Sequence, residues 1–179
     1  MQWYEKDQSL LDYELQCMKD FQRDFGHPAF KYAHRIRKYP EISADDPRCD
    51  GKFEIIVQIP FHPHPESPWE IWKFQLLYDD NHPVQVDEDS GSIKAYPLER
   101  LVEKRPGFYA RVEIDQHFHH LYYNPDRPTE RRYICYRPKE AEDSEINAGA
   151  VLENITRWML VYYVYKNTGR DTDARPVQR

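Results

Sequence analysis

The sequence has few of the residues on which disulfide-stabilised, zinc-binding and nucleotide-binding proteins depend. Its 179 residues include only 3 Cys, too scattered for a disulfide framework or a paired-cysteine zinc site, at positions 17, 49 and 135. Only 6 Gly are present, and there is no Gly-rich phosphate loop, serine-centred elbow or His-Glu-x-x-His motif. These absences argue against kinases, GTPases and dinucleotide-dependent enzymes. The low cysteine content also indicates a reducing compartment, and we expect a cytoplasmic protein.

A basic surplus and a long apolar run are also missing. The chain carries 25 Lys and Arg against 31 Asp and Glu, a formal net charge of −6, whereas general nucleic-acid binders normally carry a basic surplus. The longest apolar stretch, Trp158 to Tyr165, is far shorter than the ~20 residues of a membrane-spanning helix. The N-terminus has no apolar run typical of a signal peptide. We therefore expect protein partners, and neither nucleic acid nor membrane.

Two segments have the apolar periodicity of helices, one near each end of the sequence. The first stops at Gly26, and its apolar face is formed by Leu11, Leu15, Met18 and Phe25. The second stops at Asn167-Thr-Gly169, and its apolar face is formed by Val151, Leu152, Ile155, Trp158, Met159, Tyr162 and Tyr165. We expect the aromatic residues of this second face to pack against a sheet as core, rather than to stack on bases.

Alternating apolar residues between the two helices predict antiparallel strands. Runs over 53–59 and 71–78 are separated by the turn-rich stretch 60–68, which favours a hairpin. Less regular sequence follows, and then a third alternating run directs four residues inward, namely Phe108, Ala110, Val112 and Ile114. Strands flanked by helices indicate an α+β fold. We expect one domain over 1–169 and a polar tail over 170–179.

Cys135 is the strongest candidate for a reactive group. It lies within Arg131-Arg-Tyr-Ile-Cys-Tyr-Arg-Pro138, and nearby cations lower the pKa of a thiol and so favour the nucleophilic thiolate. The alternative is a buried and inert cysteine. Cys17 lies beside the apolar face of the first helix, where we expect core packing. Cys49 lies in a polar loop without a neighbouring His or Asn.

A histidine cluster, His117-Phe-His-His120, precedes Cys135 by 15 to 18 residues. An imidazole can donate a hydrogen bond to an oxyanion, act as a base or bind a metal. A metal site would also recruit His62 and His64, but no acidic or Cys ligand at a diagnostic spacing accompanies them. The histidines therefore leave open two readings, support of a nucleophilic cysteine or a His-cluster metal hydrolase.

The order of elements, with three local motifs, resembles the ubiquitin-conjugating enzyme family, particularly its divergent bacterial branch. His82-Pro83 looks like the family's Tyr-Pro or His-Pro turn after a strand. His117-Phe-His119 resembles the His-Pro-Asn or His-Pro-His tripeptide, and Tyr133-Ile-Cys-Tyr136 resembles the strip around the catalytic cysteine. The last helix, with its Thr-Gly ending, is similar to that of the bacterial branch. Two departures are a Phe in the tripeptide in place of Pro, and a longer interval before the cysteine, which implies an insertion around 124–132.

The resemblance implies a ubiquitin-conjugating-enzyme-like fold, an antiparallel meander flanked by N- and C-terminal helices, and a transferase activity. Cys135 would accept a ubiquitin-like protein as a thioester from a ubiquitin-activating-like enzyme and pass it to an amine of a target protein. No metal or organic cofactor is required. His119 would stabilise the oxyanion and His117 would orient the loop, with His120 and Asn124 as alternatives. Enzymes of this branch occur in bacterial antiphage operons, and the resemblance implies that setting too. A non-catalytic module of the same fold, which binds a ubiquitin-like partner, is the first alternative.

Overall fold

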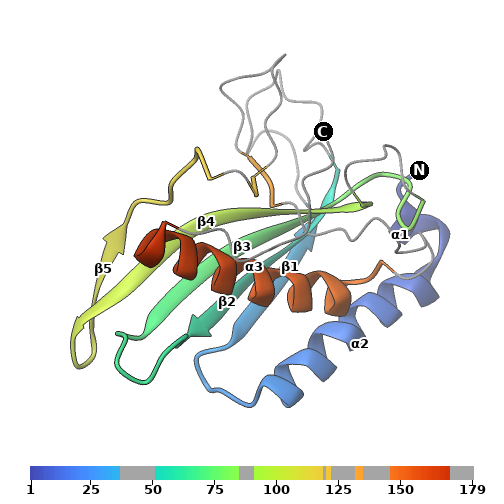
Figure 1. Cartoon of the computed structure of the whole chain (residues 1–179). Helices are drawn as coiled ribbons and strands as arrows, with labels where there is room; N and C mark the ends of the chain where they lie inside the picture. The colour runs from blue at the N-terminus through green and yellow to red at the C-terminus, as the bar shows by residue number, and fades with distance from the viewer. Residues whose placement is uncertain (37–50, 85–90, 119, 122–131, 135–145, 170–179) are drawn as a thin grey trace.

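The structure, a computed structural model of the whole chain, describes residues 1–36, 51–84, 91–118, 120–121, 132–134 and 146–169. In chain order its elements are α1 (Trp3–Lys6), α2 (Gln8–Phe25), β1 (Lys31–Ile36), β2 (Phe53–Phe61), β3 (Glu70–Tyr78), β4 (Ile93–Arg105), β5 (Phe108–Val112) and α3 (Ala148–Thr168). The strands form one five-stranded antiparallel sheet in sequence order. Figure 1 shows α2 and α3 on the same face of this sheet, with α3 lying across the strands. The expected α+β class, with an antiparallel sheet and flanking helices, is confirmed.

The two long helices begin and end at residues that favour helix caps. The side chain of Asp7 accepts a hydrogen bond from the Leu10 N–H at the start of α2, and Asn147 does the same for Ala150 at the start of α3. Gly26 and Gly169 end the helices in the left-handed conformation, with φ of 67° and 68°. Both predicted helices and their stops are confirmed. Within the described part of the chain, no helix has the length and apolar content needed to cross a membrane.

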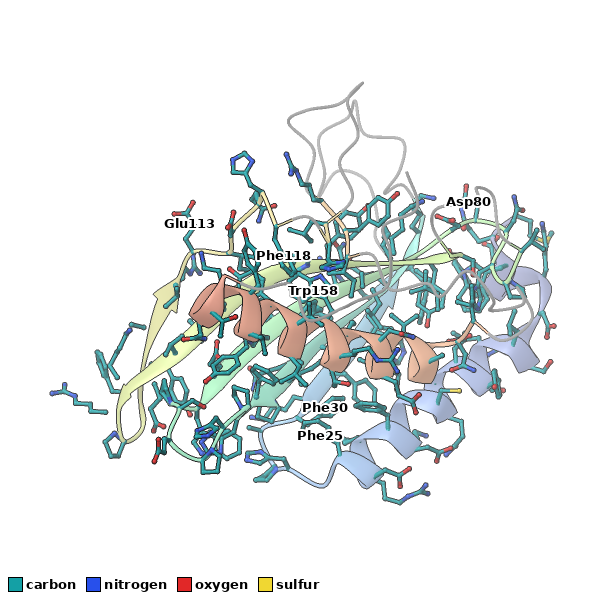
Figure 2. All side chains as sticks on the ribbon, viewed as in Figure 1. Phe25, Phe30, Asp80, Glu113, Phe118 and Trp158 are labelled. Atoms are coloured by element: carbon teal, nitrogen blue, oxygen red, sulfur yellow. The ribbon has the colours of Figure 1, made fainter. Side chains whose placement is uncertain are left out.

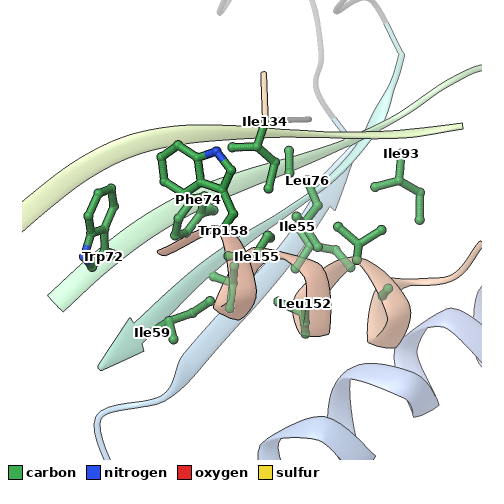
Figure 3. Packing of buried hydrophobic residues seen from close by; sticks show 14 of the residues in the cluster. Ile55, Ile59, Trp72, Phe74, Leu76, Ile93, Ile134, Leu152, Ile155 and Trp158 are labelled. Atoms are coloured by element: carbon green, nitrogen blue, oxygen red, sulfur yellow. The ribbon is translucent and has the colours of Figure 1, made fainter. Parts of the chain in front are cut away.

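The β2–β3 hairpin supplies most of the sheet's contribution to the core. Its two strands pair antiparallel with Ile55 opposite Leu76, as the two alternating runs predict. Every second side chain of each strand faces the helices and is buried: Phe53, Ile55, Val57 and Ile59 of β2, and Trp72, Phe74, Leu76 and Tyr78 of β3. Figure 3 shows Ile55, Ile59, Trp72, Phe74 and Leu76 of this set in one cluster with Leu152, Ile155 and Trp158 of α3.

The longest strand, β4, lies where the sequence pattern predicts no element. Its 13 residues contain a bulge, because Lys73 pairs with Glu99 while the next residue of β3 pairs with Pro97, which leaves Leu98 as an extra residue. Beyond the bulge, Arg100 faces the helices, forms an ion pair with Glu70, and stacks over aromatic rings. Pro97, the extra residue Leu98 and the inward Arg100 interrupt the alternation of apolar and polar residues by which a strand is recognised.

The edge strands also differ from expectation. Phe108 is 52% exposed rather than inward, because it lies at the tip of the β4–β5 hairpin, where the Arg105 guanidinium covers its ring at 4.7 Å. Ala110 and Val112 are half-buried, and Ile114 is buried just beyond the strand. At the other edge, β1 lacks the apolar alternation of a strand signal, since all its side chains except that of Tyr32 are exposed.

A buried polar network connects the helices to the sheet. One carboxyl oxygen of Glu14, on α2, accepts hydrogen bonds from the Tyr78 hydroxyl and the Ala148 N–H, each at 2.8 Å. The other oxygen lies 2.8 Å from Nε2 of His82, whose Nδ1 lies 2.7 Å from the hydroxyl of Ser92. Both Glu14 and His82 are almost completely buried. The network therefore joins α2, the end of β3, the following turn, the residue before β4 and the first turn of α3.

We expect Glu14→Ala to lower the free energy of unfolding by about 3–5 kcal/mol, the usual cost of removing one member of a buried polar pair. The substitution removes the carboxylate that contacts the Tyr78 hydroxyl, the His82 ring and the Ala148 N–H in the protein interior. Urea denaturation measures the change. Asp12→Ala, an exposed carboxylate on the same helix, is the matched control and should change stability by no more than about 0.5 kcal/mol. Equal losses in the two variants would contradict the role given to Glu14.

Candidate functional site

The described parts of the histidine and cysteine motifs meet at the outer edge of β4. The N–H of Ile134 donates a hydrogen bond to the carbonyl of Ala95 at 2.8 Å, and Leu121 forms an antiparallel bridge with Ile134. This edge is open to them because β5 pairs with β4 only from Arg100 onwards. Two segments that lie well apart in the sequence are thus side by side in the fold.

The residues just before Cys135 are fixed on both faces of the sheet. Ile134 is fully buried, and Figure 3 shows its side chain beside Trp158. Tyr133 packs on the other face, with its ring 5.8 Å from that of Tyr96 and the Lys94 ammonium at 5.8 Å from its centroid. Cys135 itself lies outside the described residues.

Helix α3 holds the start of the histidine segment through Asp115. The Asp115 N–H donates to the Tyr162 hydroxyl at 3.0 Å, and its carboxylate accepts the N–H of His117 at 2.9 Å. Lys166 of α3 also lies 3.7 Å from this carboxylate. His117 is therefore exposed, but its backbone is tied to α3 through one intermediate residue.

The same helix holds the end of the segment. The indole N–H of Trp158 donates to the His120 carbonyl at 3.1 Å. Phe118 is buried between these anchors, with its ring 5.6 Å from that of Trp158 and 5.2 Å from that of Tyr162. Figure 2 shows Phe118 and Trp158 next to each other. Where the family that the motifs resemble has a proline, this chain has an aromatic residue that anchors the segment to α3.

Arg132 links the two motifs directly. Its guanidinium donates a hydrogen bond to the backbone carbonyl of Gln116, next to His117. Of the three arginines flanking Cys135, Arg132 is the one that the structure describes. It brings a positive charge to the junction of the two motifs.

Several sequence-predicted site residues lie outside the described residues, namely Cys135, His119, Asn124 and Cys49. Of the others, His117 is exposed on a turn and His120 is half-buried against the Phe118 ring. Trp158 and Tyr162 are buried as expected of core residues. Their hydrogen bonds to the histidine segment were not predicted, because helical spacing reveals an apolar face but not the polar atoms at its rim.

His62 and His64 lie at the far end of the sheet from His117. They follow β2, which ends at Phe61. Through Glu70 of β3, Phe61 aligns with Val102 of β4. Val102 is seven residues along β4 from Ala95, where Ile134 is bound, and this separation is roughly 23 Å. The His62 ring stacks on Trp69 at 4.5 Å and lies within hydrogen-bonding distance of the Ser67 carbonyl. Among the described residues, no group of three or more His, Cys, Asp or Glu side chains is placed to hold a metal ion.

Cys17 has the surroundings of an unreactive thiol. It is half-buried and packs against the core beside α3. Burial raises the pKa of its thiol, and the negative charge of Glu14 raises it further. The thiolate fraction at neutral pH is accordingly smaller than that of a free cysteine.

Comparisons with protein-family models, with curated proteins and with solved structures found no match. The likeness to ubiquitin-conjugating enzymes therefore rests on the motifs and on the order of the elements.

We expect Cys17 to react slowly with iodoacetamide at neutral pH, and its rate to rise as the pH increases, because its raised pKa keeps the thiol protonated. A Cys49→Ser, Cys135→Ser variant isolates this thiol, and mass spectrometry follows its alkylation. The same variant in urea is the control and should react about tenfold faster. Equal rates in the folded and denatured states would contradict the prediction.

We expect Tyr162→Phe to loosen the histidine segment without unfolding the protein. The substitution removes the oxygen that accepts the Asp115 N–H, so this amide should exchange its hydrogen about five- to tenfold faster. Hydrogen exchange followed by NMR measures the rate. Tyr163→Phe, at the neighbouring position of α3, is the control and should leave Asp115 unchanged. An unchanged rate in Tyr162→Phe would show that this hydrogen bond does not restrain the segment.

Proposed function

We propose that this protein is a ubiquitin-conjugating-like transferase that carries a ubiquitin-like protein as a thioester on Cys135. The observation that carries the proposal is the bridge between Leu121 and Ile134. It brings the histidine motif to the strip that precedes the cysteine, despite the long interval in the sequence. The antiparallel meander with a helix at each end is compatible with the ubiquitin-conjugating-enzyme-like fold that we propose.

In the first step of the proposed reaction, the Cys135 thiolate attacks the thioester carbonyl that joins the ubiquitin-like protein to an activating enzyme. A new C–S bond forms, and the thiolate of the activating enzyme leaves. In the second step an amine of the target protein attacks the new thioester. The C–N bond forms, the Cys135 thiolate leaves, and the amine proton passes to solvent or a nearby base. The first step exchanges one thioester for another, and the second is driven by conversion of the thioester to an amide, so the proposed reaction needs neither a metal nor an organic cofactor.

Both steps pass through a tetrahedral intermediate whose oxyanion needs a positioned donor. We assign this role to His119 and the orientation of the loop to His117. The contacts of the neighbouring residues support the assignment. Asp115, Phe118 and His120, which flank these two histidines in the sequence, each contact Trp158 or Tyr162 of α3. The Arg132 guanidinium, hydrogen-bonded beside His117, would favour the thiolate form of a neighbouring cysteine. A free thiol of this kind is favoured by reducing conditions, so we propose a cytoplasmic location.

The test uses a glycine-ended peptide thioester of a small thiol, which replaces the activating enzyme and its cargo. We expect this reagent to acylate Cys135 at neutral pH, giving an adduct that intact mass spectrometry detects and that dithiothreitol removes. The adduct should form in Cys17→Ala and Cys49→Ala and be lost in Cys135→Ala. His119→Ala should slow its transfer to lysine by about a hundredfold, the usual effect of losing an oxyanion donor.

Two outcomes would overturn the proposal. Equal adduct formation in Cys135→Ala would place the acceptor elsewhere. Alkylation of Cys135 by iodoacetamide only after denaturation would instead favour the alternative, a non-catalytic module that binds a ubiquitin-like partner. Circular dichroism of each variant, compared with the unmodified protein, separates a lost thiol from a lost fold.

A further inference from the structure

The last strand of the sheet, β5, has backbone groups that point outward without a partner among the described residues. On β4, the N–H of Glu103 donates to the Trp69 carbonyl at 2.9 Å, so the backbone groups of Glu103 point toward the β3 side. Glu103 lies opposite Tyr109 of β5. Because backbone groups alternate in direction along an antiparallel strand, those of Tyr109 and Arg111 point away from the sheet, whereas those of Ala110 point toward β4.

A second copy of β5 can satisfy these outward groups in one register. If two copies run antiparallel with Ala110 opposite Ala110, Tyr109 of each lies opposite Arg111 of the other. Tyr109 and Arg111 are the residues whose N–H and C=O groups point outward, so they form the hydrogen-bonded pairs. This even register also keeps the helix-covered faces of both copies on the same side of a continuous sheet.

The side chains of β5 complement one another in this same register. Phe108 is 52% exposed and Val112 is half-buried, and the pairing places each opposite the other on the helix-covered face. These are non-hydrogen-bonded pairs, in which cross-strand side chains come closest. On the other face the Tyr109 ring lies opposite the Arg111 guanidinium, a pairing of an aromatic ring with a cation.

Charges flanking the strand are also arranged for antiparallel pairing. Lys104 and Arg105 precede β5 and are exposed, while Glu113 follows it and is exposed. Figure 2 shows Glu113 just past the end of the strand, away from the hairpin tip. An antiparallel copy brings the basic flank of each strand beside the acidic flank of the other, whereas a parallel copy would bring like charges together.

Edge strands usually carry features that block such pairing, such as an unpaired charge or a proline within the strand. In β5 the Arg111 charge is already paired, with its guanidinium 2.9 Å from Glu99 on the neighbouring strand. Pro106 lies in the hairpin turn, outside the strand. By contrast, β1 at the other edge carries three basic side chains, those of Lys31, His34 and Arg35.

We propose that two copies of this chain form a two-fold dimer through antiparallel pairing of β5 with β5, centred on Ala110. Each copy contributes one short strand to this β5–β5 seam. We therefore expect a small interface, with a micromolar Kd for the dimer. The proposal is independent of the function proposed for Cys135.

Cysteine cross-linking tests the register in the full-length chain with Cys17, Cys49 and Cys135 replaced by Ser. In this background Ala110→Cys should form a disulfide-linked dimer under mild oxidation, since each new cysteine lies opposite itself on the two-fold axis. Phe108→Cys alone should form far less, because its neighbour across the seam is Val112. The double variant Phe108→Cys, Val112→Cys should restore cross-linking. Equal cross-linking of Ala110→Cys and Phe108→Cys, or none in either, would overturn the proposal.

A second test uses chains that keep their native cysteines. Analytical ultracentrifugation over about 1–200 μM should show the unmodified protein dimerising. Arg111→Pro removes an outward N–H while keeping the ladder to β4, and should weaken dimerisation by about tenfold or more. Arg111→Ala, which keeps the N–H, is the control and should still dimerise. A monomeric native protein, or equal loss in the two variants, would contradict a backbone-paired seam; thermal denaturation confirms that each variant is folded.

Discussion

The fold depends on one buried carboxyl group. Glu14 satisfies donors from three separate parts of the chain, the Tyr78 hydroxyl, the His82 ring and the first N–H of α3. A carboxyl group at a helix N-terminus also opposes the partial positive charge of the helix dipole. Because buried polar groups are costly unless they are paired, the network allows one arrangement of α2, α3 and the β3–β4 turn and disfavours others.

The parts of the fold that follow simple periodicity could be predicted from the sequence. The two helices and the β2–β3 hairpin each carry a periodic row of apolar residues. Each long helix ends at a glycine that the sequence also reveals. β4 could not be recognised, because Leu98 interrupts its period and Arg100 occupies an inward position beside Glu70. Glu14 has a detectable signal, since it lies in the helical stripe between Leu11 and Met18. A carboxylate at a core position indicates a buried partner, but the sequence does not identify Tyr78 or His82 as that partner.

Less of the candidate site could be predicted. The sequence motifs single out Cys135 and the histidines, and the described structure brings their neighbours together through Leu121, Ile134 and Arg132. The support from α3 was not predictable, because Trp158 and Tyr162 read as core residues. They are core residues, yet each also directs one polar atom to the backbone of the histidine segment. The aromatic rings of α3 thus pack on the sheet, while the indole N–H of Trp158 and the hydroxyl of Tyr162 hold the histidine segment in place.

The division of β4 between two neighbours has a consequence for the order of assembly. Its second half pairs with β5 through a tight hairpin, a local contact that forms early, whereas its first half receives Ile134 from much later in the chain. We therefore expect the segment before Cys135 to dock after the β4–β5 hairpin has formed. Opening of this segment would expose Ile134, although the ladders between the strands would stay paired. The stretch before Cys135 is thus held by a backbone hydrogen bond to β4 and by the burial of Ile134, outside the continuous ladder of the five strands.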